Sequence, residues 1–348
     1  MAARLCGHVV SDLCLGKQPL RSLSASDTVG DALAALKSID DTFLSVWNCH
    51  HSFIRKQNLP LPLPLAQVCT CICIGKVCML DIICFLSKPS ADLHSPVSAL
   101  LHHNSPLLVR HLPPTASLLE AIDVMHDGVH NLVIPIQKPK QFHYLESNIH
   151  TDNSTYCWLT QEDLFRYLLN SIPLFSPTHA KPINSLGIID TQNLFAVFYD
   201  DPASSTLDLL SLSLFYQSSI AILDSNGKFA SEISPFMLNS CDDSLLPAIA
   251  TLSAGDLSSY ILCGGPLHAH QQSSSTPNNS KLGLGLGLGL GLVCHRSSSL
   301  VAVMIQALAH RVSYVWVVEH DGTLTGIVTF QGILKVFRDH LQSVRYIT

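Results

Sequence analysis

The chain has 348 residues, of which 47% are hydrophobic and 13% are charged, and its net charge at pH 7 is −6. A chain of this length and apolar content can fill two hydrophobic cores, which predicts two domains. The negative net charge and the lack of Lys or Arg clusters exclude the basic surface that nucleic-acid binding requires, so we expect no nucleic-acid partner.

The N-terminal segment shows no secretory signal, because Gly7 and His8 interrupt its apolar residues. The twelve cysteines are therefore expected to be reduced and in many cases buried, and we expect a cytoplasmic or nuclear location. Residues 10–16 form a short lead-in, and residues 183–187 are similar to it. Each half of the chain is thus predicted to begin in the same way.

The first predicted unit begins with a helix at residues 29–36, where apolar residues follow helical spacing after Thr28. Residues 43–47 combine β-branched and aromatic side chains and predict its first strand. Alternating prolines within residues 48–65 disfavour a central strand or helix. This stretch is predicted to be an extended, polyproline-like loop insertion.

Residues 65–86 are long and apolar enough to allow two interpretations, a membrane span or a strand, turn and helix. Lys76 and Asp81 lie inside the stretch, and each would cost about 2.5–3.5 kcal/mol near the centre of a bilayer. The repeat pattern described below independently predicts the strand, turn and helix. We therefore expect no membrane partner, and a membrane-tethered regulator is the alternative.

Cys69, Cys71 and Cys73 alternate along the predicted strand and therefore share one face of it. Cys49 and the histidines at residues 50–51 could complete a metal site with them, but the usual zinc spacing of two intervening residues is absent. The favoured interpretation is that these cysteines are small, buried, apolar side chains, and we expect no bound metal.

The second unit repeats the order of elements, with a helix at residues 118–125 and a strand at residues 131–136. The polar residues 137–156 predict a second loop insertion, after which residues 158–164 supply a strand and the start of a closing helix. Two prolines near residue 175 mark the boundary between the halves of the chain.

The third unit begins with a strand at residues 195–199, followed by a helix and two further strands between residues 205 and 234. Residues 245–262 then show helical spacing. Residues 266–292 form a low-complexity segment that ends in a strict Leu-Gly alternation. Because glycine at every second position disfavours regular structure, we expect a flexible linker; a strand with all its leucines on one face is the alternative.

The fourth unit is the clearest, with a helix at residues 300–309 after a serine cap and a strand at residues 314–318. A tight turn at Asp321-Gly322 connects to a second strand at residues 326–329, and a closing helix follows.

Four helices occupy equivalent places in these units, and Val29, Leu118, Leu207 and Leu300 begin them at spacings of 89, 89 and 93 residues. This regularity, together with the constant order of elements, indicates four copies of one unit. A unit this small buries little apolar surface alone, so the copies are expected to pack in pairs.

This order of helices and strands, with the sequence Gly326-Ile327-Val328-Thr329 in the fourth unit, resembles the CBS domain, whose members sense adenosyl compounds. The resemblance covers nearly the whole chain and is closest to plant proteins made only of four CBS repeats, similar to the γ subunits of SNF1-related and AMP-activated kinases. It implies an α/β (α+β) fold in which four repeats pair into two tandem CBS (Bateman) modules. The implied modules are residues 1–175, with repeats at about 17–90 and 105–172, and residues 176–348, with repeats at about 183–262 and 293–342.

CBS domains hold ribose with a pattern of Gly, two apolar residues, Ser or Thr, two variable residues and Asp. A carboxylate can accept hydrogen bonds from both hydroxyls of a diol. The second repeat keeps both polar groups, Thr160 and Asp163, although Cys157 replaces the glycine. Of the other repeats, the first keeps Asp81 and the fourth keeps Thr329.

The resemblance also implies a basic residue just before the first strand of some repeats, where it contacts phosphate. His130 matches that position in the second repeat. A structural role is the alternative for each of these residues, with Thr160 capping the closing helix and Asp163 in its first turn. The His126-Asp127 pair lacks a nucleophile, metal set or phosphate loop around it, so we expect no catalytic residues.

The resemblance implies a non-catalytic regulator that needs no cofactor, with AMP, ADP, ATP or S-adenosylmethionine as candidate ligands. We expect a protein partner, for which an SNF1-related kinase complex is the candidate, and a homodimer is a candidate assembly. The alternative function is a protein-interaction scaffold with degenerate nucleotide sites, because the carboxylate is lost from the third and fourth repeats.

Overall fold

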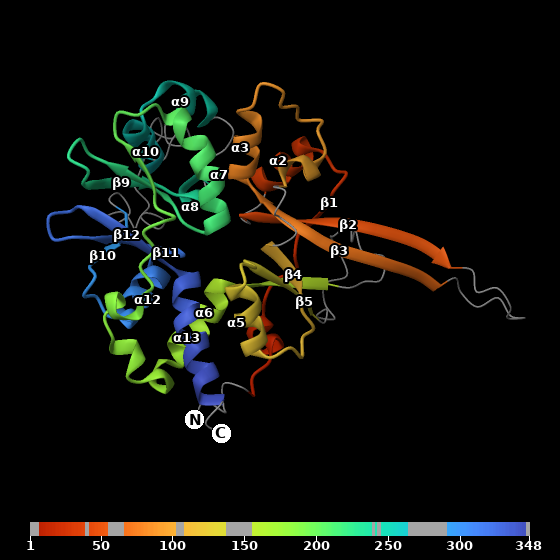
Figure 1. The fold of residues 1–348 in the computed structure, drawn as a ribbon. Coiled ribbons are helices and arrows are strands. Elements are labelled where there is room, and N and C mark those ends of the chain that lie inside the picture. The colour runs from red at the N-terminus through yellow and green to blue at the C-terminus, as the bar shows by residue number, and fades with distance from the viewer. Residues whose placement is uncertain are drawn as a thin grey trace, which may run out of the picture. The chain divides into compact units, whose positions relative to one another are not determined.

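The computed structural model describes residues 7–38, 42–54, 66–101, 108–136, 155–238, 241, 245–263 and 291–345. The chain separates into two compact units, and Figure 1 follows it from red at the N-terminus to blue at the C-terminus. One unit contains residues 3–78 and 92–161, and the other contains residues 1–2, 79–91 and 162–348. The division into modules at residue 175 stays a prediction.

Four three-stranded sheets organise the described residues, and in each the middle strand is parallel to the first strand and antiparallel to the third. The sheets are β1 (Ser22–Ser24), β2 (Phe43–Ile54) and β3 (Ala66–Cys78); β4 (Val109–His111), β5 (Asn131–Ile136) and β6 (Thr155–Thr160); β7 (Phe195–Phe198), β8 (Ile220–Leu223) and β9 (Phe229–Ile233); and β10 (Val293–Cys294), β11 (Tyr314–Val318) and β12 (Leu324–Thr329).

Two helices occur at the same places along the chain in each of the four repeats. One connects the two parallel strands, and these helices are α2 (Val29–Lys37), α5 (Leu118–His126), α7 (Thr206–Tyr216) and α12 (Leu300–Ala309). The other follows the third strand, and these are α3 (Met79–Leu86), α6 (Gln161–Asn170), α8 (Pro235–Leu238) and α13 (Phe330–Arg345). The four predicted copies therefore adopt one common order of elements, and the mixed α/β fold is confirmed.

Local sequence explains why the connecting helices begin where they do. The side chains of Thr28, Ser117 and Ser299 each accept a hydrogen bond from the backbone N–H three residues later. This satisfies one of the donors that a helix start leaves without an intrahelical partner. The third helix, α7, instead continues from a 3₁₀ turn at Ala203–Ser205.

Short backbone bridges join the copies in pairs. Val9, at the lead-in of the first repeat, bridges to Ser117 of the second, and Pro96 before the second repeat bridges back to Thr28. In the other half, Pro182 bridges to Ser299 of the fourth repeat. Thr28, Ser117 and Ser299 are all helix N-caps, so each bridge joins a segment near the start of one repeat to the first turn of a helix in the paired repeat. The predicted pairing of first with second and third with fourth repeat is thereby present.

The prediction of a loop insertion at residues 48–65 is wrong for its first part. Strand β2 continues to Ile54, because residues 48–54 pair in antiparallel register with residues 66–72 of β3. Residues 48–54 are a strand because they pair with β3, and their own sequence does not predict that pairing. Residues 55–65, with their prolines, lie outside the described residues. The second insertion also ends earlier than predicted, since β6 starts at Thr155.

The helical spacing of residues 245–262 corresponds to two helices, α9 (Leu246–Thr251) and α10 (Ala254–Leu262), and not to one. Leu252 is extended, and the side chain of Ser253 accepts a hydrogen bond from Asp256 N at 3.1 Å. The serine therefore starts a new helix inside a periodic stretch. The Leu-Gly segment up to residue 290 lies outside the described residues.

The stretch with two interpretations is described from residue 66 onward, where it is the strand β3 followed by the eight-residue helix α3. Among the helices that the structure describes, none is long and apolar enough to cross a membrane.

Candidate functional site

The second repeat brings its predicted polar residues to one end of its sheet. Thr160 is the last residue of β6, and it lies opposite Asn131, the first residue of β5. His130 precedes Asn131, and its backbone N–H donates to Leu108 O at 2.9 Å. Helix α6 begins directly after Thr160 and carries Asp163 in its first turn. His130, Asn131 and Thr160 thus lie at one end of this sheet, and Asp163 lies in the first turn of the helix that follows Thr160 along the chain.

This end of the sheet contains two buried polar atoms that sequence reasoning did not select. Asn131 and Gln161 are each only 4% exposed, and His130 is 8% exposed. Within the described part of the chain, Asn131 Nδ2 and Gln161 Oε1 have no hydrogen-bond partner. A buried polar group left without a partner costs about 1–3 kcal/mol, so folded proteins rarely keep one without a reason.

The two atoms have complementary chemistry. Asn131 Nδ2 is a hydrogen-bond donor, and Gln161 Oε1 is an acceptor. A side-chain amide offers the donor and acceptor that pair with the N6 and N7 edge of adenine. The Asp163 carboxylate, in the turn that follows, has the chemistry to accept hydrogen bonds from a ribose diol. These groups could hold an adenosine compound.

In the third and fourth repeats, the hydroxyl of the ribose pattern is used as a helix cap. Thr329 Oγ1 accepts from Gly332 N at 3.3 Å, and Ser234 Oγ accepts from Met237 N at 3.1 Å. The structural interpretation considered for Thr160 is thus observed at the corresponding hydroxyls. In both repeats the residue that donates to the hydroxyl replaces the expected aspartate, so these repeats offer a hydroxyl without its carboxylate.

The glycine of the pattern has a packing role in the fourth repeat. A Cβ atom on Gly326 would lie 2.5 Å from Ile189 Cγ2 and 3.0 Å from Asp190 O. Asp190 and Ile327 exchange two backbone hydrogen bonds, at 2.8 and 2.9 Å, which join the segment before β7 to β12. In the second repeat the corresponding contact comes from Leu20, whose N–H donates to Tyr156 O at 2.8 Å. Cys157 replaces the glycine there and is fully buried.

The remaining predicted residues lie at corresponding places in their own repeats. Asp81 is in the first turn of α3, after Cys78, which occupies the hydroxyl position and is 1% exposed. Thr329 ends β12. Neither residue belongs to the end of the β4-β5-β6 sheet, and a ribose contact by either stays a prediction.

A second buried polar group lies between the sheets of the third and fourth repeats. Glu232 is 7% exposed, and its carboxylate accepts a hydrogen bond from the Trp316 indole N–H. Burial raises the pKa of Glu232, and the hydrogen bond from Trp316 opposes that rise. Sequence reasoning missed this carboxylate, because a single acidic residue in a short alternating strand reads as solvent-facing.

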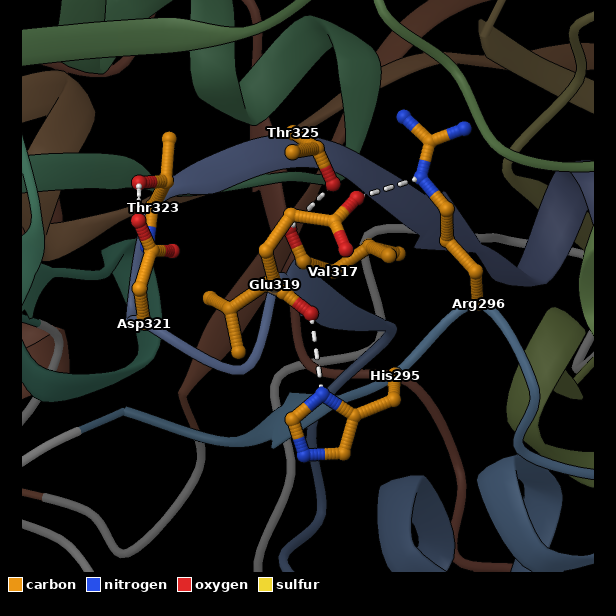
Figure 2. A network of polar contacts seen from close by, with 8 residues as sticks. His295, Arg296, Val317, Glu319, Asp321, Thr323 and Thr325 are labelled. Carbon is orange, nitrogen blue, oxygen red and sulfur yellow. Dashed lines mark hydrogen bonds and ion pairs between the residues drawn. The ribbon is translucent and has the colours of Figure 1, made fainter.

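The turn of the fourth repeat carries a polar network at the opposite end of the β11-β12 hairpin from Thr329. Figure 2 shows Arg296 directed at Glu319. Arg296 Nε lies 2.9 Å from Glu319 Oε1, and His295 Nδ1 lies 3.0 Å from Val318 O. The arginine and glutamate side chains are about half exposed, so their ion pair is worth no more than about 1 kcal/mol. The predicted tight turn, where Gly322 has a φ of +88°, contains hydrogen bonds from Thr323 N to Asp321 Oδ1 and from Gly322 N to Glu319 O, both at 3.0 Å.

The side chains that the structure describes contain no group of three His, Cys, Asp or Glu residues that could hold a metal ion. The side chains of residues 50–54 and 66–70 lie outside that description, and with them part of the cysteine and histidine set considered above. Of the rest of that set, Cys73 is buried and the other two described cysteines are half-buried.

Comparison with known proteins gives a consistent result. The family model of the CBS domain matches residues 292–339. The CBS domain-containing protein CBSX5 of Arabidopsis thaliana is 38% identical over 402 residues, which cover 99% of this chain and 100% of that protein. The SNF1-related protein kinase regulatory subunit gamma-like PV42b of the same plant is 22% identical and covers 78% of this chain and 77% of its own length.

Among solved structures, protein MJ1225 from Methanocaldococcus jannaschii matches with a TM-score of 0.59 at 13% identity. The match covers 95% of this chain and 100% of that one. At this identity the likeness supports the fold alone.

Proposed function

This chain belongs to the family of CBS domain-containing proteins, and on that premise we propose that it is a non-catalytic regulator that binds an adenosine-containing nucleotide in its second repeat. The binding residues would be Asn131 and Gln161 for the base, Thr160 and Asp163 for the ribose, and His130 for the phosphate. The observation that carries the proposal is a pair of buried polar atoms, at the first residue of β5 and the first residue of α6, that have no hydrogen-bond partner among the described residues.

Ligand binding would offset the desolvation of these two buried polar atoms. Folding places an amide donor and a carbonyl acceptor out of water with no partner among the described residues. A ligand that supplies both partners recovers the free energy that their desolvation costs, about 1–3 kcal/mol for each atom. Adenine offers such partners on one edge. A nucleobase without a matching acceptor and donor would leave both atoms unsatisfied.

The regulated partner that we propose is a kinase complex of the SNF1-related class. The support is the relative whose name describes a gamma-like regulatory subunit of such a kinase, which is similar over 78% of this chain. A ligand changes the partner's behaviour only if it binds two arrangements of the regulator with different affinity.

The test is calorimetry on the full chain with AMP, ATP and S-adenosylmethionine. We expect heat with at least one of them, and a loss of affinity of tenfold or more in Asn131→Ala and in Asp163→Ala. The matched control is Ser234→Ala, which removes a hydroxyl from the same position of a repeat that has Met237 in place of the aspartate. Its affinity is expected to equal that of the wild type.

The loss of the carboxylate from the third and fourth repeats favours a second function, a protein-interaction scaffold without a nucleotide. Absence of heat with all three compounds would support the scaffold and contradict nucleotide binding. Equal affinity in wild type and Asp163→Ala would also contradict the proposed site. Pull-down from plant extract with and without the binding nucleotide would then test whether a kinase subunit is retained in a ligand-dependent way.

A further inference from the structure

The hairpin of the first repeat is much longer than those of the other three. Strand β2 has 12 residues and β3 has 13, whereas the corresponding strands of the other repeats have four to six. Figure 1 shows these two strands running on together beyond the short strand β1. Strand β1 pairs with residues 45–47 of β2, so the two strands continue from there as a two-stranded ribbon.

Two cysteines lie directly opposite each other at the root of this ribbon. Cys49 of β2 is the register partner of Cys71 of β3. Residues directly opposite in an antiparallel pair have Cα atoms about 4.5–5.5 Å apart, whichever type of pair they form. A disulfide accepts Cα separations of about 4.4–6.8 Å. The backbone therefore already has the spacing that a disulfide needs.

The burial pattern puts both thiols on the same face of the ribbon. Their neighbours Asn48 and Ile72 are exposed, whereas Trp47 and Cys73 are buried, so the side chains alternate with the strand period. Cys49 and Cys71 are both half-buried, and both pack against the core cluster that contains Trp47 and Cys73. They lie at the border of that core, close enough to the surface for a small oxidant to reach.

Cys73, one of the cysteines next to this pair on β3, is a poor competitor for the bond. Cys73 lies opposite Trp47, which makes it a diagonal neighbour of Cys49 at about 7–8 Å between Cα atoms. It is 4% exposed, and burial raises the pKa of its thiol to about 12, which suppresses the reactive thiolate. Its Sγ is also engaged with Gly75 O at 3.4 Å.

We propose that Cys49 and Cys71 form an oxidation site that closes to a disulfide across the β2-β3 hairpin. The oxidant is of the disulfide class, with glutathione disulfide as its representative. The thiolate of one cysteine attacks glutathione disulfide, breaks its S–S bond and releases one glutathione. The second cysteine then displaces the other glutathione as the protein S–S bond forms. The two cysteine sulfurs are oxidised, glutathione disulfide is reduced to two glutathione molecules, and these take up the two thiol protons.

The disulfide would stabilise the two-stranded ribbon of β2 and β3. The bond would close the chain between residues 49 and 71 and restrict the unfolded state, which stabilises the folded hairpin. We expect a rise in melting temperature of about 3 °C or more on oxidation.

The experiment uses the full chain in its folded state. The reduced protein is incubated with glutathione disulfide, remaining thiols are alkylated under denaturing conditions, and the digest is analysed by mass spectrometry. We expect a peptide pair joined through Cys49 and Cys71, reversed by dithiothreitol. Cys49→Ser and Cys71→Ser should each abolish the cross-link. The matched controls Cys73→Ser and Cys241→Ser, which change a diagonal neighbour and a half-buried cysteine of the other unit, should keep it.

Three results would overturn the proposal. One is a mixed disulfide with glutathione at Cys49 or Cys71 that never resolves to the cross-link. Another is a bond from Cys49 to Cys73, and the third is complete resistance of both thiols to oxidation. Mapping of the wild-type chain decides between these outcomes even if a serine variant fails to fold. The proposal does not depend on nucleotide binding, so failure of one leaves the other standing.

Discussion

The two pairs of repeats each bury a tryptophan completely, but they satisfy its indole N–H in different ways. Trp47 of the first repeat donates to Ser45 Oγ at 2.8 Å, and that hydroxyl donates in turn to Arg21 O at 2.7 Å. Trp316 of the fourth repeat donates to the buried carboxylate of Glu232. One fold therefore accepts a neutral or an ionisable partner at its centre. Only the second choice couples the stability of the core to pH.

The largest effect is expected when the tryptophan itself is changed. Trp316→Phe removes the Glu232 carboxylate's donor and leaves a cavity, so we expect the free energy of unfolding to fall by about 3 kcal/mol. Trp47→Phe leaves a similar cavity but should cost about 1–2 kcal/mol less, because the Ser45 hydroxyl keeps its acceptor, Arg21 O. Urea denaturation of both variants at pH 7 measures the difference. Equal losses would show that the carboxylate adds nothing to the second core.

The buried carboxylate of Glu232 is expected to make the stability of the second core depend on pH. The folded state raises the pKa of Glu232 above its ordinary value of 4.5, mainly through burial. Between 4.5 and that raised pKa the folded state binds more protons at this group than the unfolded state, so the contribution of Glu232 to stability is fully present below pH 4.5 and is lost as pH rises through the folded pKa. The slope can reach about 1.4 kcal/mol per pH unit for this one group.

Glu232→Gln should abolish this slope while keeping a hydrogen-bond acceptor for Trp316. Urea denaturation at a series of pH values checks it, with Ser45→Ala as the control in the first pair, since a hydroxyl does not titrate in this range. The Ser45→Ala curve should run parallel to that of the wild type. A wild-type curve parallel to that of Glu232→Gln would contradict the prediction.

How far the sequence predicts this molecule depends on whether the signal is local. The caps Ser117 and Ser299 and the turn at Gly322 were predictable, because propensity and turn chemistry act over a few residues. The continuation of β2 to Ile54 was not, because it depends on a partner strand more than ten residues away. The buried carboxylate of Glu232 was also not predictable, since it is explained only by a tryptophan 84 residues later.

The residues of the candidate site also differ in whether a local sequence signal could predict them. The pattern around Thr160 and Asp163 selected one strand end of the second repeat, because the order of elements repeats along the chain, and ligand binding there stays a prediction. It did not select Asn131 or Gln161, whose importance comes from burial without a partner. A polar residue next to a predicted strand gives no sign of whether it will face water or the core. Only the three-dimensional structure separates these cases.

Gly326 and Gly75 both occupy the glycine position of the ribose pattern, Gly75 in the first repeat, and both are closely approached by neighbouring atoms. A Cβ on Gly326 would meet the backbone oxygen of Asp190 as well as a side chain, whereas a Cβ on Gly75 would meet only the end of Leu101, at 2.7 Å. We expect Gly326→Ala to lower the free energy of unfolding by about 2 kcal/mol. Gly75→Ala should cost less, because the Leu101 side chain can rotate away. Thermal denaturation of the two variants tests this order, and a larger loss in Gly75→Ala would reverse it.

The smallest effect is expected at the helix caps. Ser299→Ala removes a single hydrogen bond, from Ala302 N at 3.3 Å, and should cost about 1 kcal/mol. Thr28 has a reciprocal arrangement, since Asp31 N donates to its hydroxyl while the Asp31 carboxylate accepts from Thr28 N and Oγ1. Thr28→Ala should therefore destabilise more than Ser299→Ala at pH 7.

The comparison between these caps also depends on pH. The hydrogen bonds from Thr28 lower the pKa of Asp31, so its contribution is present above the ordinary value of 3.8 and is lost as pH falls through the lowered folded pKa. The excess loss in Thr28→Ala over Ser299→Ala should consequently shrink below pH 3.8. Urea denaturation of both variants at pH 7 and at pH 3 measures it. An excess that stays constant would mean that the Asp31 carboxylate takes no part in fastening the first helix.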